Sequence, residues 1–66
     1  MNTNMLNEKL EFVELVVKYT NTRDENIFSK IKEMSELIAS KEKRFNGKSI
    51  AYMFETLRWE LLGIWS

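Results

Sequence analysis

Apolar residues recur along the chain at the spacing of amphipathic helices, in three segments separated by two polar breaks. The polar side of the first segment carries Glu14 and Lys18, four residues apart in the order that favours an ion pair. The β-branched residues in this segment would also suit a strand, but no partner strand follows, so we predict a helix over about residues 5–20. Its apolar face consists of Leu6, Leu10, Val13 and Val17, widened by Phe12, Val16 and Tyr19.

The second segment, about residues 23–45, begins with a capping box. Thr22 precedes Glu25 by three residues, so we expect the Thr22 side chain to cap this helix. Cations in the last turns suit the helix dipole, and Asn46-Gly47 provides a stop signal. The apolar seam follows a heptad-like spacing at Ile27, Ile31, Met34, Ile38 and Phe45.

The third segment, about residues 49–65, has large apolar residues on two sides. Ser49 or Asn46 is the expected cap. Tyr52 and Trp59 lie seven residues apart, one above the other, on the side opposite the main stripe. That stripe consists of Ile50, Met53, Phe54, Leu57, Leu61, Ile64 and Trp65.

Three helices joined by short turns predict an all-α fold, a small antiparallel three-helix bundle forming a single domain over residues 1–66. The expected core is Leu6, Leu10, Val13, Val17, Ile27, Ile31, Met34, Ile38, Phe45, Ile50, Phe54, Leu57 and Leu61. A second set of large residues has no place in that core and predicts a contact surface: Phe12, Leu15, Tyr19, Phe28, Leu37, Tyr52, Trp59, Leu62 and Trp65. The alternative is a different packing, in which several of these residues, Trp59 among them, are buried.

The composition favours self-association. A chain of 66 residues buries only about 60% of its unfolded surface, so disulfides, metals or oligomerisation commonly stabilise domains of this size. The chain has no cysteine and no histidine, which leaves oligomerisation. Equal numbers of acidic and basic residues do little to keep two copies apart. We therefore expect a homodimer formed through the third helix.

The aromatic pair of the third helix is the expected centre of a partner-binding site. Tyrosine and tryptophan bring large, rigid contact areas and dominate binding hot spots. Charged residues beside the pair would form a polar rim. The predicted partner-binding residues are Tyr52, Trp59, Trp65, Glu55, Arg58 and Leu62.

The chain lacks the residues that most catalytic and metal sites need. No serine has a histidine to activate it, and the two glycines are too far apart for a phosphate-binding loop. The pairs Glu11/Glu14 and Glu33/Glu36 resemble the E-x-x-E … E-x-x-D signature of the all-α nucleotide pyrophosphatases, with Glu36 in place of the aspartate. The resemblance implies a Mg²⁺ site, but these carboxylates lie opposite the apolar faces. We expect no enzyme activity, no metal and no cofactor.

A basic cluster links the second and third segments and consists of Lys41, Lys43, Arg44 and Lys48. In the main interpretation these cations complete the C-terminus of the second helix. A formal net charge of zero argues against a dedicated nucleic-acid binder. A small nucleic-acid-associated regulator that uses this cluster is the alternative function.

The chain shows no targeting signal. It does not begin with basic residues followed by an apolar run, and no run approaches the ~18 residues of a membrane span, so we expect a cytoplasmic protein. Residues with AT-rich codons are common, whereas Gly, Ala, Arg and Pro are scarce, as in phages and other mobile elements of low-GC bacteria. We predict a small non-catalytic protein–protein interaction module, an inhibitor or regulator that binds and occludes a host protein.

Overall fold

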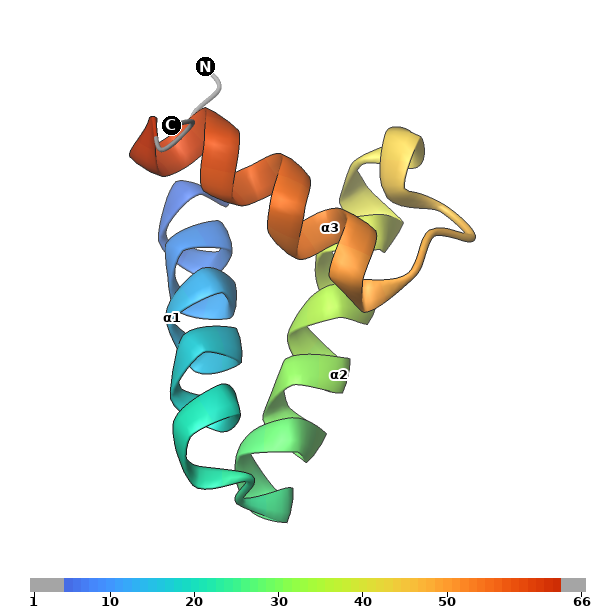
Figure 1. Cartoon of the computed structure of the whole chain (residues 1–66). Helices are drawn as coiled ribbons and strands as arrows, with labels where there is room; N and C mark the ends of the chain where they lie inside the picture. The colour runs from blue at the N-terminus through green and yellow to red at the C-terminus, as the bar shows by residue number, and fades with distance from the viewer. Residues whose placement is uncertain (1–4, 64–66) are drawn as a thin grey trace.

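The computed structural model describes residues 5–63, which form three α-helices and two short helical turns. The elements are α1 (Leu6–Thr22), α2 (Glu25–Lys41), the 3-10 turn η1 (Lys43–Phe45), α3 (Ile50–Leu57) and the π-helical turn η2 (Arg58–Leu62). α1 and α2 form an antiparallel hairpin, and α3 crosses its open end (Figure 1). The predicted all-α three-helix bundle is confirmed.

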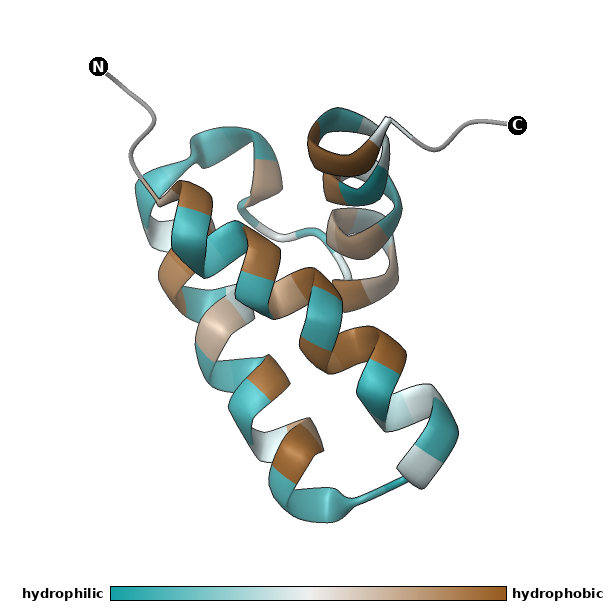
Figure 2. Ribbon diagram, turned by 90° about the vertical axis from the view of Figure 1, so that its left-hand side faces the viewer, coloured by the Kyte–Doolittle hydropathy of each residue, from teal (hydrophilic) through white to brown (hydrophobic). Residues whose placement is uncertain are grey.

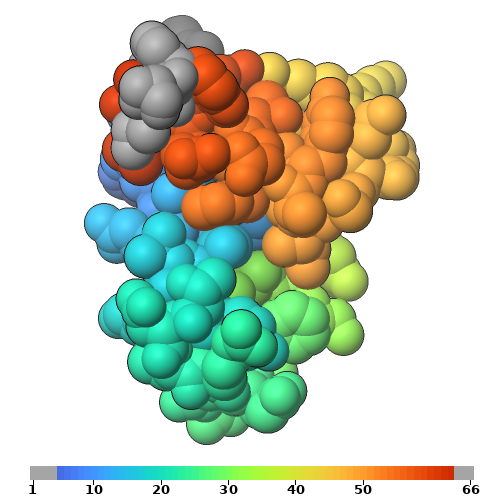
Figure 3. Space-filling model, viewed as in Figure 1, coloured from blue at the N-terminus to red at the C-terminus, as the bar shows by residue number. Residues whose placement is uncertain are grey.

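α3 covers only part of the hairpin. In the space-filling view the orange and red residues of α3 and η2 lie over the upper part of the molecule, whereas the teal and green end of the hairpin extends below them (Figure 3). At that lower end the hairpin is held by its own contacts, including the rings of Tyr19 and Phe28, whose centroids are 5.2 Å apart. The third helix therefore completes the core at one end of the hairpin only.

The turn between α1 and α2 differs from the predicted capping box. α1 continues to Thr22, and Arg23 then adopts a left-handed conformation with φ 55° and donates its N–H to the Tyr19 carbonyl. Asp24 is the N-cap of α2, since its carboxylate accepts the Asn26 N–H at 2.8 Å. The prediction for Thr22 is wrong because an N-cap residue needs extended backbone angles, and Thr22 is still helical.

α2 ends four residues before the predicted boundary. Its last residue is Lys41, Glu42 is extended with φ −120°, and η1 follows as a separate turn. A continuous helix would carry Phe45 about 10 Å beyond Ile38 along the axis, whereas the break returns the Phe45 ring to the core with no exposed surface. Gly47, with φ 79°, then reverses the chain in a conformation that disfavours other residues.

α3 begins as predicted and changes pitch before its end. The Ser49 side chain caps it by accepting the Tyr52 N–H at 3.1 Å. From Arg58 the helix widens into η2, and Gly63 ends it in a left-handed conformation, donating its N–H to the Trp59 carbonyl. Ile64 and Trp65, which the sequence places in the apolar stripe, lie outside the described residues.

The core draws on all three helices. Its buried apolar residues are Phe12, Val13, Ile31, Met34, Ile38, Phe45, Met53 and Leu57. Six of these were predicted core residues, and Ile27, Ile50, Phe54 and Leu61 pack against them as partly buried residues. Phe12 was assigned to the surface set, and Met53 was placed in the stripe without a core position.

The predicted core face of α1 is the main error. Leu6 and Val17 are 43% and 46% exposed, and Leu10 is half-buried. α1 is instead rotated so that Phe12, which is fully buried, points into the core. An aromatic side chain removes more apolar surface from water than a leucine or valine does, so the rotation that buries Phe12 is favoured.

Candidate functional site

The outer side of α3 and η2 carries two large aromatic side chains. Tyr52 is 48% exposed and Trp59 is 42% exposed, whereas Met53 and Leu57, which point inward from the same helix, are at most 1% exposed. α3 is therefore covered on one side only. The alternative in which Trp59 is a core residue is wrong for this structure, and we call the surface of Tyr52 and Trp59 the α3 aromatic face.

Two contacts to its ring hold Tyr52 in place. The buried ring of Phe45 meets it edge-on, with the two centroids 6.3 Å apart. The ammonium of Lys48 lies 5.2 Å from the Tyr52 centroid, within the range of a cation–π contact. Tyr52 is thus positioned by a core residue and by a member of the predicted basic cluster.

Two of the residues predicted as a polar rim, Glu55 and Arg58, form an ion pair with each other. Arg58 donates to a Glu55 carboxylate oxygen at 2.6 Å, one helical turn back. The guanidinium carbon of Arg58 also lies 5.7 Å from the centroid of the Phe54 ring, which packs against the core. Arg58 is therefore anchored by an ion pair and by a ring contact. Leu62, the next predicted site residue, is 47% exposed, and Trp65 lies outside the described residues.

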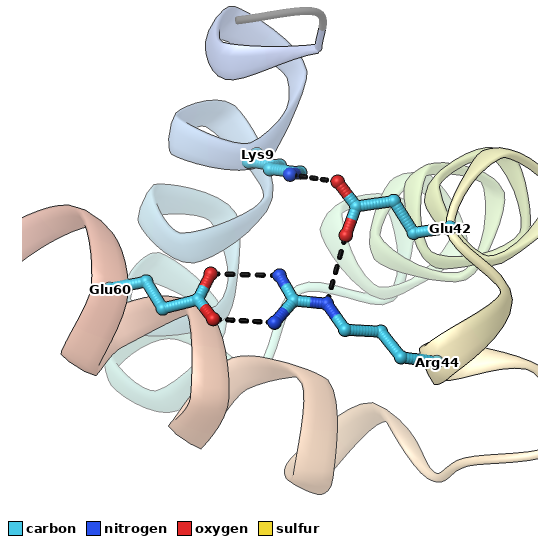
Figure 4. Close-up of polar contacts among 4 residues, drawn as sticks. All are labelled: Lys9, Glu42, Arg44 and Glu60. Atoms are coloured by element: carbon cyan, nitrogen blue, oxygen red, sulfur yellow. Dashed lines mark hydrogen bonds and ion pairs between the residues drawn. The ribbon is translucent and has the colours of Figure 1, made fainter. Parts of the chain in front are cut away.

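The basic cluster is engaged in ion pairs more than the sequence indicates. Arg44 donates two hydrogen bonds to the two carboxylate oxygens of Glu60, one of them 2.8 Å long, and a third to Glu42 at 2.9 Å. Glu42 also pairs with Lys9 of α1, so four residues from α1, the α2–α3 connection and η2 form one network (Figure 4). We call this set, Lys9, Glu42, Arg44 and Glu60, the ion-pair network.

The ion-pair network shifts the pKa values of Glu42, Glu60 and Arg44. The hydrogen bond from Lys9, with a further one from Arg44, holds the pKa of Glu42 below its ordinary value in spite of partial burial. The hydrogen bonds from Arg44 likewise lower the pKa of Glu60. Glu60 in turn raises the pKa of Arg44. Glu42, Glu60 and Arg44 are therefore charged near neutral pH, and Arg44 faces two carboxylates.

The four predicted nucleic-acid contacts therefore have different surroundings. Arg44 is paired with Glu42 and Glu60, and Lys48 lies over Tyr52. Lys41 and Lys43 are exposed and form no ion pair within residues 5–63. The structure brings the cluster to one connection, where Arg44 has anionic partners and Lys48 contacts an aromatic ring, whereas Lys41 and Lys43 form no ion pair within residues 5–63.

A groove that the sequence did not predict runs beside α1. Its volume is about 430 Å³, and Leu62 of η2 faces α1 across it. The remaining lining residues are Val13, Glu14, Val17, Lys18 and Asn21, all from one side of α1. Glu14 and Lys18 do not form the predicted ion pair with each other. No spacing within α1 indicates this groove, because its lining includes Leu62 of η2.

The paired glutamates noted in the sequence do not come together into a metal site within residues 5–63. Glu11, Glu14, Glu33 and Glu36 are all exposed, and within residues 5–63 no three acidic, histidine or cysteine residues gather into a group able to hold a metal ion. In the same part of the chain no helix has the length and apolar character to cross a membrane.

Comparison with known proteins gives no match: no family model, no curated protein and no solved structure is similar to this chain. A function must therefore be inferred from two surfaces of the molecule. They are the α3 aromatic face and the groove beside α1.

Proposed function

We propose that this chain is a non-catalytic protein-binding module that inhibits or regulates a partner protein by covering part of its surface. The observation that carries the proposal is the exposure of Tyr52 and Trp59 on the side of α3 opposite the core. Tyrosine and tryptophan are enriched among the residues that supply most of the binding free energy in protein interfaces. Large exposed apolar side chains of this kind mark contact sites.

The surroundings of the α3 aromatic face suit such a contact. Phe45 and Lys48 hold the Tyr52 ring, so little side-chain freedom is lost there when a partner binds. The Glu55–Arg58 ion pair supplies a charged border beside the apolar surface. An apolar centre with a polar rim is the usual anatomy of a protein interface.

The length and composition of the chain also indicate what kind of protein the partner is. A short chain rich in residues with AT-rich codons is typical of phages and other mobile elements of low-GC bacteria. We take the partner to be a protein of the host cell and the cytoplasm to be the place of action. The nucleic-acid alternative has less support, because Arg44 of the basic cluster is held by two carboxylates and Lys48 lies over the Tyr52 ring, which leaves two of the four cations, Lys41 and Lys43, without such a contact in the described residues.

The test compares capture by three forms of the tagged protein from a nuclease-treated lysate of the bacterium that carries the gene. These are the wild type, the double variant Tyr52→Ala/Trp59→Ala, and the control Leu37→Ala, which removes an apolar side chain of similar exposure from α2. We expect one protein to be retained by the wild type and by Leu37→Ala but not by the double variant. Circular dichroism must show that all three forms remain helical.

Equal capture by all three forms, or no capture at all, would contradict the proposal. Capture that occurs only from a parallel lysate without nuclease treatment, and that weakens steeply with salt, would instead identify a nucleic-acid partner. In that case the double variant Lys41→Gln/Lys43→Gln should bind more weakly and with a flatter salt dependence.

A further inference from the structure

The apolar stripe of α1 is only partly covered within the molecule. Leu6, Leu10, Val13 and Val17 follow each other at intervals of four, three and four residues, which is the spacing of a helix seam that packs against another helix. Val13 is buried, but Leu6 and Val17 remain 43% and 46% exposed. Brown apolar bands recur along α1, the helix nearest the viewer in Figure 2.

The groove extends this stripe toward η2. Leu62, which is 47% exposed, forms the wall opposite Val13 and Val17. The groove has a volume of about 430 Å³ and is open to solvent. A helix from another molecule that lies along α1 would therefore contact the stripe and reach Leu62.

The charges beside the stripe indicate what that other molecule is. Glu14 and Lys18 lie one turn apart on the same side of α1, both are exposed, and neither forms an ion pair within residues 5–63. When two copies of such a face meet about a two-fold axis with their helices antiparallel, the acid of each copy approaches the base of the other. The face is therefore complementary to itself in charge.

We propose that α1 forms a symmetric homodimer interface, in which the exposed Val17 and Leu62 of one copy pack against the same residues of a second. Glu14 of each copy then pairs with Lys18 of the other. This interface uses none of the residues of the α3 aromatic face, so it goes beyond the proposed function. It also differs from the dimer through the third helix that the sequence suggests.

The size of the surface suits a dimer of this kind. A stable interface buries about 800 Å² on each partner, roughly a sixth of the 4618 Å² that the protein exposes. α1 has 17 residues and is therefore about 25 Å long, enough for several turns of contact. A 66-residue chain without cysteine gains stability from such an association.

Charge reversal at two positions tests the proposal most directly. Glu14→Lys gives each copy two cations at the interface, and Lys18→Glu gives each copy two anions. We expect either variant to raise the dissociation constant of the dimer on the order of tenfold. An equimolar mixture of the two variants should restore a dimer of wild-type affinity, because each acid again meets a base. Sedimentation equilibrium over a concentration series measures the dissociation constant of the wild type, of each variant and of the mixture.

Three further variants locate the interface. Val17→Glu places a charge in the stripe and should give a monomer at every concentration, while circular dichroism remains that of a helical protein because Val17 is half-exposed in the single chain. Leu37→Glu, at an exposed position of α2, should leave the dissociation constant unchanged. Tyr52→Ala/Trp59→Ala should also leave it unchanged, although the same variant abolishes partner capture if the proposed function is right.

Several outcomes would overturn the proposal. A wild-type protein that is monomeric at every concentration rules out the dimer. A dimer that survives Val17→Glu but is lost in Tyr52→Ala/Trp59→Ala moves the interface to α3. Two charge-reversal variants that do not recover association when mixed show that Glu14 and Lys18 do not meet across a two-fold axis.

Discussion

The apolar stripes of α1 and α2 have the same spacing and different surroundings. Ile27, Ile31, Met34 and Ile38 of α2 repeat the intervals of four, three and four residues that separate Leu6, Leu10, Val13 and Val17 of α1. In α2 the last three residues of the stripe are buried. In the α1 stripe only Val13 is buried, and the two ends of the stripe remain nearly half-exposed. Identical spacing therefore did not lead to identical burial.

The difference lies in what the rest of each helix carries. Beside its stripe α2 has mostly polar and small residues, so only one rotation buries its large side chains well. α1 also carries Phe12, Val16 and Tyr19, which gives it a wide apolar surface and more than one rotation that buries apolar area. Packing selects the rotation that buries Phe12, and the stripe is left beside the groove.

The first prediction concerns the side chain that holds α1 in its rotation. Phe12→Ala should lower the free energy of unfolding by about 3–5 kcal/mol because Phe12 is fully buried. That loss is comparable with the whole stability of a domain of this size, roughly 3–10 kcal/mol. Val17→Ala, on the stripe, should change the free energy by no more than about 0.5 kcal/mol. Urea denaturation in dilute solution measures both.

If Val17→Ala proves as costly as Phe12→Ala, α1 is rotated as the stripe spacing alone would suggest. The dilute solution matters, because a dimer through α1 would add a concentration-dependent contribution to the Val17 variant.

The second comparison takes matching positions of the two stripes. Ile31→Ala in α2 should cost about 2–5 kcal/mol, since Ile31 is 1% exposed and the surrounding core cannot fill the cavity completely. Leu6→Ala in α1 should cost under about 1 kcal/mol because Leu6 is 43% exposed. Comparable losses for the two variants, measured by urea denaturation, would show that the stripes are equally buried in solution.

The third prediction concerns the ion-pair network, which links Lys9 of α1 to the α2–α3 connection. Glu42→Gln removes the carboxylate shared by Lys9 and Arg44 and should lower the free energy of unfolding by about 1 kcal/mol at neutral pH, the upper end for exposed pairs. The matched control is Glu33→Gln, an exposed acid of α2 without an ion pair in the described residues. Equal effects of the two substitutions would mean that the network does not stabilise α1 in its place.

The smallest expected effect is the pH dependence of the same network. The pKa values of Glu42 and Glu60 are held below the ordinary 4.5 by Lys9 and Arg44. Since a carboxyl whose pKa is lowered in the folded state stabilises the fold above its unfolded pKa, this contribution is full near pH 7 and is lost as the pH falls below about 4.5. The stability difference between the wild type and Glu42→Gln should therefore shrink between pH 6 and pH 3, as followed by urea midpoints. A difference that stays constant over this range would exclude the charged pair as its source.

Much of the fold follows from local signals. The break between the first two helices, the cap at Ser49 and the stripe of α2 lie where the pattern predicts them. The cap of α2 and the end of α2 were predicted wrongly, since α1 runs on through Thr22 and Phe45 is drawn back into the core by a break at Glu42. In both cases a local signal was present, but the neighbouring packing moved the boundary.

Of the two candidate sites, the α3 aromatic face could be predicted from the sequence and the groove could not. The exposure of Tyr52 and Trp59 follows from their position opposite the stripe of the third helix, which the sequence shows. The groove beside α1 does not follow, because it needs Leu62 to lie across from Val13 and Val17. The partners of Arg44 were missed for a similar reason, as Glu60 is 16 residues away and meets it only after α3 has crossed the hairpin.

The sequence by itself determined the helices, their order, the buried side of α2 and the outward side of α3, because these depend on spacing within one segment. The tertiary structure decided the rotation of α1, the recovery of Phe45 into the core and the pairing of Arg44 with Glu60. These depend on how much apolar surface each helix can bury against the others, and on which charges then come within reach, so no single segment contains the answer.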